Sequence, residues 1–366
     1  MSKLLLQGTV TSGLLEFCRV TQAAVTSEAA SMSQNLQGTT IGITGISGFL
    51  GRHIAERCLM RGAVVKGLDL HGPEGPEYEF ILGDVTSPSD IKRLCAGCNV
   101  IIHTAAIVKE GGDRALFERV NVGGTRNVVE AAQAAGVRRF IHLSSVMVYG
   151  LTFEGEVNEE SPLNGEGNPY CQTKIDSERV AMERHISGQF DVVAVRSGDV
   201  YGPGSLPWTV RPIRMMKAGV FTLANGGRGV LNPVYIDNLV DAVLLVLQTN
   251  RTGEAYNITD GQVVTCRDFF VHYAHMLGRG RLRYAPAWLL KGSLRAWQFL
   301  LALLGTEPRI HPDSIAFVTR RGTYSIEKAK AVLGYVPNVE LVEGMRRTEE
   351  WARSVGLILP RQRPVA

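Results

Sequence analysis

The sequence is poor in features that mark several classes of protein. Its 39 Lys and Arg residues and 35 Asp and Glu residues leave a formal net charge of +4, with no basic run interleaved with aromatic residues. Because a phosphate backbone is typically bound by a run of that kind, nucleic acid is not an expected partner. The apolar stretch of residues 287–304 is interrupted by Lys291 and Arg295, so it is a poor transmembrane span.

Cysteine and histidine are scarce and poorly placed for metal binding. The six cysteines include one C-x-x-C pair, Cys95 and Cys98, without a second pair nearby, and the eight histidines show no H-x-H or H-E-x-x-H spacing. No metal is therefore expected. A nucleophile elbow is missing as well, which disfavours a hydrolase. Nothing marks the chain as secreted, and a reducing cytoplasm is the expected location.

The first 38 residues differ from the rest in composition. They are rich in Ser, Thr, Gln and Ala, and the three leucines after Lys3 are too few for a signal-peptide core. We expect a flexible N-terminal extension over residues 1–38. Met32 leaves open whether residues 1–31 belong to the mature protein.

From Gly38 onward, short apolar runs alternate with amphipathic stretches of helical length, which is typical of repeated βαβ units. The pattern predicts an α/β protein with a doubly wound parallel sheet of the Rossmann type. The expected strands are Thr40–Thr44, Val64–Leu68, Phe80–Leu82, Val100–His103, Phe140–Leu143 and Val192–Val195. The expected helices are Leu50–Arg61, Ala115–Ala135, Pro169–His185 and Asn238–Gln248.

After about residue 204 the alternation ends and helices dominate: Asp268–Leu277, Trp288–Leu304, Ile326–Leu333 and Val342–Val355. We therefore expect a nucleotide-binding domain over residues 39–204 and a smaller, mostly helical substrate-binding lobe over residues 205–366. A strand and helix near Val234–Leu247 are expected to return to the sheet. On that interpretation residues 230–250 belong to the first domain, and the two parts interleave.

A glycine motif comes after the first strand. Gly45, Gly48 and Gly51 form GxxGxxG between a strand and a helix, the context in which glycines give a tight turn, close approach to a pyrophosphate and close helix packing. A phosphate at the helix N-terminus would meet free N–H groups. Phe49 and Leu50, between the last two glycines, are expected to contact the cofactor too.

An acidic residue ends the second strand and bears on the choice of cofactor. Asp69 lies 24 positions (69 − 45) after Gly45. A carboxylate there accepts the ribose hydroxyls and repels a 2′-phosphate, and no arginine comes directly after it. The sequence therefore predicts NAD in preference to NADP.

Three further residues form a candidate catalytic set. Tyr170 and Lys174 are four apart on a helix capped by Asn168, so they share one face. A nearby ammonium stabilises a phenolate whose ordinary pKa is near 10. Ser145 comes just after a strand, at the edge of the sheet where ligands of such folds bind. We expect Ser145 to hold the substrate oxygen while Tyr170 takes its proton.

Together these motifs resemble the extended short-chain dehydrogenase/reductase superfamily, which includes sugar-nucleotide epimerases and dehydratases and the 3β-hydroxysteroid dehydrogenases. The resemblance runs from about Thr40 to Leu357 and rests on TGISGFLG, GDV, HTAA, NVGGT, SSVMVYG and YCQTK. It implies that Asp84 and Val85 border the adenine, that Ala105 lies along the cofactor, and that Asn121 supports the active-site helix. It also favours Ser145 over Ser144 and implies a homodimer through the helices that flank the fourth and fifth strands.

Two positions bear on the substrate. Sugar-nucleotide members usually carry an Asn where this sequence has Asp199, and an Arg that grips the diphosphate where it has Leu231. Leucine offers a diphosphate no charge, and a carboxylate opposes one. The segment VYIDN instead resembles the VYVDN of 3β-hydroxysteroid dehydrogenases, which implies oxidation of a secondary alcohol on a steroid, sterol or similar apolar ring.

Alternatives remain open. A sugar-nucleotide epimerase or dehydratase is the main one, and a non-catalytic dinucleotide-sensing protein on the same fold is another. Residues 287–304 could line a pocket for a flat apolar substrate, rest on a membrane surface, or simply pack on the lobe.

Overall fold

The computed structural model describes residues 35–73, 75–109, 112–304 and 311–359 of the chain. Most of the predicted N-terminal extension, residues 1–34, lies outside the described residues. Residues 35–38 are described, and Leu36 is buried in the main hydrophobic core, where its N–H donates to the carbonyl of Arg61 at 2.7 Å.

A seven-stranded sheet forms the centre of the molecule, and every neighbouring pair in it is parallel. Because its strands are covered on both faces, most of them read as apolar runs. Their order across the sheet is β3-β2-β1-β4-β5-β7-β12. The bounds are β1 Thr40–Thr44, β2 Val64–Asp69, β3 Glu79–Leu82, β4 Val100–His103, β5 Arg139–Ser145, β7 Asp191–Ser197 and β12 Glu254–Ile258.

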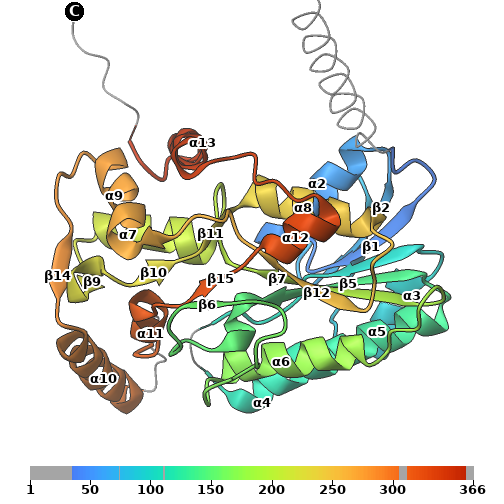
Figure 1. Cartoon of the computed structure of the whole chain (residues 1–366), viewed down its shortest axis with the longest axis horizontal. Coiled ribbons are helices and arrows are strands. Elements are labelled where there is room, and N and C mark those ends of the chain that lie inside the picture. The colour runs from blue at the N-terminus through green and yellow to red at the C-terminus, as the bar shows by residue number, and fades with distance from the viewer. Residues whose placement is uncertain (1–34, 74, 110–111, 305–310, 360–366) are drawn as a thin grey trace, which may run out of the picture.

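Helices cover both faces of the sheet (Figure 1). On one face lie α2 (Phe49–Met60) and α8 (Ile236–Gln248), with α12 (Glu327–Leu333) against α8 and β12. On the other lie α3 (Pro88–Cys95), α5 (Gly124–Ala134) and α6 (Pro169–Met182). The chain order reverses between β1 and β4, and a crevice for ligands is expected beyond the carboxyl ends of the strands at such a point.

The predicted Rossmann sheet is confirmed, with differences in detail. The predicted strand near Val234 is β11 (Pro233–Tyr235), which pairs with β8 (Asp199–Tyr201) in a separate two-stranded sheet. The strand that joins the main sheet from this region is β12, which was not predicted. The predicted helix 115–135 is broken into α4 (Arg114–Phe117), a π-helical turn η1 (Glu118–Gly123) and α5.

The remaining elements gather at the far end of the sheet, with α10 at the outer edge (Figure 1). Apart from α12, the helices are α7 Arg211–Lys217, α9 Cys266–Met276, α10 Ala287–Leu303, α11 Ser314–Thr319 and α13 Leu341–Ser354, with short turns η2 Val146–Tyr149, η3 Leu206–Val210 and η4 Asn225–Gly227. The short strands are β6 Glu156–Val157, β9 Thr222–Ala224, β10 Val230–Leu231, β13 Val264–Thr265, β14 Arg283–Ala285 and β15 Thr323–Tyr324. Across the part of the chain described, no helix is both long and apolar enough to cross a bilayer.

Candidate active site

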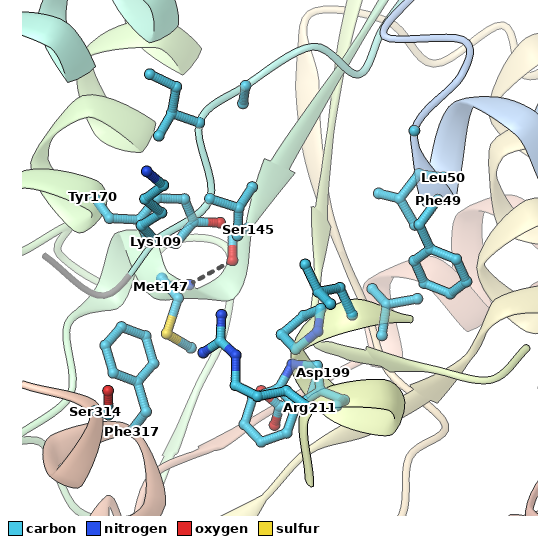
Figure 2. Close-up of a pocket in the computed structure, with 18 of the residues that line it drawn as sticks. Phe49, Leu50, Lys109, Ser145, Met147, Tyr170, Asp199, Arg211, Ser314 and Phe317 are labelled. Atoms are coloured by element: carbon cyan, nitrogen blue, oxygen red, sulfur yellow. Dashed lines mark hydrogen bonds between the residues drawn. The ribbon is translucent and has the colours of Figure 1, made fainter. Parts of the chain in front are cut away.

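One cavity of about 1310 Å³ opens at the carboxyl edge of the sheet and extends under the helical lobe. Figure 2 shows Phe49 and Leu50 on one side of it and Ser145 and Tyr170 on the other. Of the residues that the sequence predicts for the site, the cavity wall contains all except Asn121: Gly45, Gly48, Phe49, Leu50, Gly51, Asp69, Asp84, Val85, Ala105, Ser145, Tyr170 and Lys174. The fold thus brings Gly45 and Lys174, which are 129 positions (174 − 45) apart in sequence, into the wall of one cavity.

The glycine turn between β1 and α2 has room for backbone only. Gly45 has φ +70°, and a Cβ there would lie 2.9 Å from the backbone of Ala105. A Cβ at Gly51 would collide with the carbonyl of Gly45. The first turn of a helix has N–H groups without intrahelical partners, and the first residues of α2, Phe49 and Leu50, line the cavity together with Gly48. This arrangement fits a pyrophosphate.

Asp69 is held at the end of β2 by main-chain donors. Its Oδ2 accepts from the N–H of Ser47, within the glycine turn, at 3.0 Å, and its Oδ1 accepts from the N–H of Leu70 at 2.7 Å. The carboxylate is therefore fixed beside the glycine turn on the cavity wall. That is the position at which a carboxylate meets the ribose of a dinucleotide.

Asp84 and Val85 continue the same wall after β3. The Oδ1 of Asp84 accepts from the N–H of Thr86 at 2.8 Å, and the N–H of Asp84 donates to Asp90 at 3.1 Å. Gly124 of α5 lies so close that a Cβ on it would be 2.7 Å from the Val85 side chain. This wall and Asp69 together suit an adenosine, because they combine a carboxylate with an apolar surface.

Ser145 and Tyr170 meet where β5 ends and α6 begins. The side chain of Asn168 caps α6 by accepting from the N–H groups of Tyr170 and Cys171 at 3.0 and 3.2 Å. The hydroxyl group of Tyr170 lies towards that of Ser145, and the Oγ of Ser145 accepts from the N–H of Met147 at 3.2 Å (Figure 2). Burial raises the pKa of Tyr170, and the nearby hydroxyl of Ser145 opposes that rise.

Lys174 is buried beneath Tyr170. Its ammonium donates to the carbonyl of Leu143 on β5 at 2.7 Å. Burial lowers its pKa to about 8, and the charge of Glu178 opposes this fall. The interactions that bear most on the pKa of Tyr170 are burial and Ser145, so the stabilisation of a phenolate by Lys174 stays a prediction.

Behind the site lies a buried charged network that was not predicted from the sequence. Glu178 accepts from the Oγ of Ser144 at 2.5 Å and from the Nε of Arg196 at 3.1 Å, and Arg196 also donates to the hydroxyl of Tyr149 at 2.6 Å. Glu178 lies four residues after Lys174 on the same helix face, which is the signal that could have indicated it. The network fixes the end of β5 against α6.

Asn121 lies behind the cavity wall in η1, where it links two segments. Its Oδ1 accepts from the N–H of Ile107 at 2.7 Å, and its Nδ2 donates to the Oγ1 of Thr173 on α6 at 3.2 Å. A wide π-helical turn is common at functional sites. The contact with α6 is of the kind that the resemblance implies for Asn121.

The half of the cavity under the lobe is apolar. Its wall includes aromatic and aliphatic side chains from η3, α9, α10 and α11 and from the segment before β9: Trp208, Phe221, Phe270, Leu290, Leu294, Trp297 and Phe317. Figure 2 shows Phe317 and Met147 beside Ser145 and Tyr170. This part of the wall offers a ligand mainly apolar and aromatic contacts.

Asp199 does not present a free charge to the cavity, contrary to the expectation that it opposes a diphosphate. Its carboxylate forms a buried salt bridge with Arg320 and accepts from the N–H of Asn232 at 2.9 Å. Its charge is therefore already compensated. Leu231 is fully buried in the core, so this position offers no cation to a ligand. Arg211, in contrast, lines the cavity.

The fold and the site define a dinucleotide-binding protein of the Rossmann class. Residues 41–259, more than half of the chain, match the model of the NAD dependent epimerase/dehydratase family, and the chain belongs to this family. It is an NAD-dependent enzyme of the oxidoreductase and epimerase type.

Individual relatives are distant but cover most of the chain. It is 28% identical over 347 residues to sterol-4-alpha-carboxylate 3-dehydrogenase, decarboxylating, of Homo sapiens, covering 88% of this chain and 91% of that one. It is 28% identical to 3-beta-hydroxysteroid dehydrogenase of Mycolicibacterium neoaurum, covering 81% and 86%. Among solved structures, DesIV (dTDP-glucose 4,6-dehydratase) from Streptomyces venezuelae with NAD and TYD bound is 25% identical, with a TM-score of 0.70 and coverage of 88% and 100%.

Proposed function

We propose that this protein oxidises a secondary alcohol on a steroid, sterol or similar apolar ring to a ketone, with NAD as the acceptor. The observation that carries the proposal is the apolar wall of the cavity beside Ser145 and Tyr170. Curated relatives that act on sterols and 3β-hydroxysteroids support the choice of substrate class.

In this proposal the residues have distinct tasks. Ser145 and Tyr170 hold the substrate oxygen between their hydroxyl groups, and Tyr170 takes its proton. Lys174, once it meets the nicotinamide ribose, brings a positive charge that favours the phenolate. Bound NAD supplies the hydride acceptor for the carbinol carbon. Asp69, Asp84, Val85, Ala105 and the glycine turn hold the cofactor, and Asn121 positions α6.

Absorbance at the NADH band tests the proposal. Purified protein and NAD are mixed in turn with 3β-hydroxysteroids, other apolar alcohols and nucleotide sugars. We expect net NADH with the steroids and not with the sugars. Absence of NADH with every apolar alcohol, together with conversion of a nucleotide sugar to its epimer or dehydrated product, would overturn the proposal.

The second candidate is a sugar-nucleotide epimerase or dehydratase, in which the hydride returns to the same molecule. Arg211 favours it, because this arginine is part of the cavity wall and arginine is a common partner of phosphate groups. The NADH measurement separates the two, since an epimerase forms no net NADH. Replacement of Arg211 by Met distinguishes them further: it should raise the KM for a nucleotide sugar much more than the KM for an uncharged steroid.

We also propose a homodimer in which α5 and α6 of one protomer pack against those of its partner. These are the helices that the resemblance implies for the interface, and they lie side by side on one face of the sheet. Light scattering of the purified chain measures the mass directly. A monomer at all concentrations would contradict the proposal.

A further inference from the structure

Ser314 differs from its neighbours in the apolar half of the cavity wall. It is the first residue of α11, and Ile315, Phe317 and Val318 of the same helix line the cavity with it. Its Oγ is shielded from water, and among the residues that the structure describes it has no hydrogen-bond partner. Ser314 therefore places an unpaired hydroxyl group on a mainly apolar surface.

Two other hydroxyl groups, one on α11 and one on α10, are already bonded within their own helices. On α11, the Oγ1 of Thr319 donates to the carbonyl of Ile315 at 2.7 Å. On α10, the Oγ of Ser293, which also lines the cavity, donates to the carbonyl of Leu290 at 3.0 Å. Either group would lose a hydrogen bond by turning to a ligand. The Oγ of Ser314 loses no such bond when rotation about χ1 between staggered positions turns it toward the cavity.

An unpaired hydroxyl group in a cavity wall favours a ligand that pairs with it. Buried polar groups of proteins are almost always hydrogen-bonded, because removing them from water without a partner is costly. A ligand oxygen that bonds to Ser314 recovers this cost, and a ligand without that oxygen does not. All the α11 residues that line the cavity are uncharged, so a neutral ketone or hydroxyl group suits this position better than an ion.

Ser314 lies away from the two residues at which the alcohol is proposed to react. Figure 2 shows the ring of Phe317 and the side chain of Met147 between Ser314 and those two residues, Ser145 and Tyr170. A substrate whose alcohol lies at Ser145 and Tyr170 therefore meets Ser314 with its remote end. Between the two ends it makes apolar contacts with the cavity wall.

We propose that Ser314 is a specificity-determining residue that binds a second, neutral oxygen of the substrate. This oxygen belongs to a ketone or hydroxyl group at the end of the ring system remote from the alcohol. The inference rests on the proposed function for the kind of ring system and for the end that reacts. Ser314 donates to a ketone, and it either donates to a hydroxyl group or accepts from one.

Equilibrium dialysis with two steroids tests the inference. Both are 3β-hydroxyandrostanes; one carries a ketone on the D ring, remote from the alcohol, and the other has hydrogen there. NADH is present, so that the alcohol is not oxidised. We expect the unaltered chain to bind the ketone about five-fold more tightly. Ser314→Ala should remove this difference by weakening binding of the ketone alone, and Ser314→Thr, which keeps a hydroxyl group, should retain most of it.

Ser293→Ala is the matched control, because it removes a hydroxyl group of the same cavity that is bonded within its own helix. This variant should keep the preference for the ketone. Ser314→Ala should melt no lower than the unaltered chain, since it removes a hydroxyl group without a hydrogen bond in the described structure. Equal Kd values for the two steroids in the unaltered chain would overturn the inference. So would a preference that persists in Ser314→Ala, or failure to bind either steroid.

NADH formation from the same two steroids is measured separately, with NAD in place of NADH. NADH from both steroids together with equal Kd values would contradict only the role of Ser314. A preference for the ketone that depends on Ser314, without NADH from either steroid, would contradict only the proposed function.

Discussion

At the scale of single residues, Tyr170 gives the most direct test of the proposed chemistry. Its side chain lines the cavity together with Ser145, whose hydroxyl opposes the rise in the pKa of Tyr170. Tyr170→Phe removes only that oxygen. Since general acid–base catalysis typically contributes 10² to 10⁴-fold, we expect kcat to fall by about that factor. Titration with NAD should show an unchanged Kd, and an unchanged kcat would exclude Tyr170 as the base.

His103 is a buried histidine that connects the sheet to α5. Its ring bridges the Oγ1 of Thr44 on β1 at 2.7 Å and the Oγ1 of Thr125 on α5 at 2.9 Å. Thr125 donates its own proton to the carbonyl of Asn121 at 2.6 Å, so it must accept from the Nε2–H of His103. The Nδ1 of His103 then accepts from Thr44. The neutral imidazole thus links the sheet to Asn121 and, through Asn121, to α6.

Burial lowers the pKa of His103 to about 3, and burial also lowers that of the adjacent His142. The unfolded chain therefore binds protons below pH 6.5 that the folded chain does not. The contribution of His103 is fully present above that pH and should fall between pH 6.5 and 3, by about 1.4 kcal/mol per pH unit. His142 should add a loss in the same direction. Urea unfolding at pH 7 and pH 5 measures the loss.

His103→Gln should reduce this dependence on pH, although it also lowers stability at pH 7 by breaking the bridge. The control is His275→Gln, which replaces an exposed histidine on α9. A slope against pH that is the same in both variants would show that His103 is protonated in the folded protein.

At the scale of elements, the buried pair of Asp199 and Arg320 connects β8 with the segment after α11. The exposed fractions of the two side chains are 4% and 1%. Breaking such a pair leaves a buried charge uncompensated and typically costs 3–5 kcal/mol, whereas replacing both partners with apolar residues is often nearly neutral. Arg320→Met should therefore lower the free energy of unfolding by about 3–5 kcal/mol.

The double variant Asp199→Leu, Arg320→Met should recover most of that loss, as measured by urea unfolding. If the two substitutions destabilise additively, the pair is not coupled in this way. The double variant also removes the carboxylate from the cavity wall without leaving a buried arginine that lacks its partner. The kinetics of this variant therefore report on the cavity wall rather than on folding.

How much the sequence predicts varies from element to element. β1 and β4 agree with their predicted bounds because apolar runs flanked by turn residues mark buried parallel strands. β12 was missed because its EAYNI segment mixes a charged, an amide and an aromatic residue. The break at η1 was missed because the amphipathic pattern of a π-helical turn differs little from that of an α-helix.

The same limit applies to the site. Local motifs predicted the glycine turn, Asp69, Ser145, Tyr170 and Lys174, which all line one cavity in the structure. Ion pairs between residues far apart in sequence leave no local pattern. Arg320 pairs with Asp199 across 121 positions, and because this contact could not be predicted, Asp199 was expected to present an uncompensated charge on the cavity wall.

At the scale of the whole molecule, the cofactor stabilises the fold by mass action. A ligand that binds only the folded state at about 100 times its Kd adds about 2.7 kcal/mol to the free energy of unfolding. NAD should therefore raise the Tm, whereas NADP should raise it much less because its 2′-phosphate meets the carboxylate that Ser47 and Leu70 fix. Asp69→Asn should narrow the difference between the two cofactors by improving NADP. A Tm raised equally by both in the unaltered protein would mean that Asp69 does not face the ribose, and the placement of the adenosine along β2 and β3 would then be wrong.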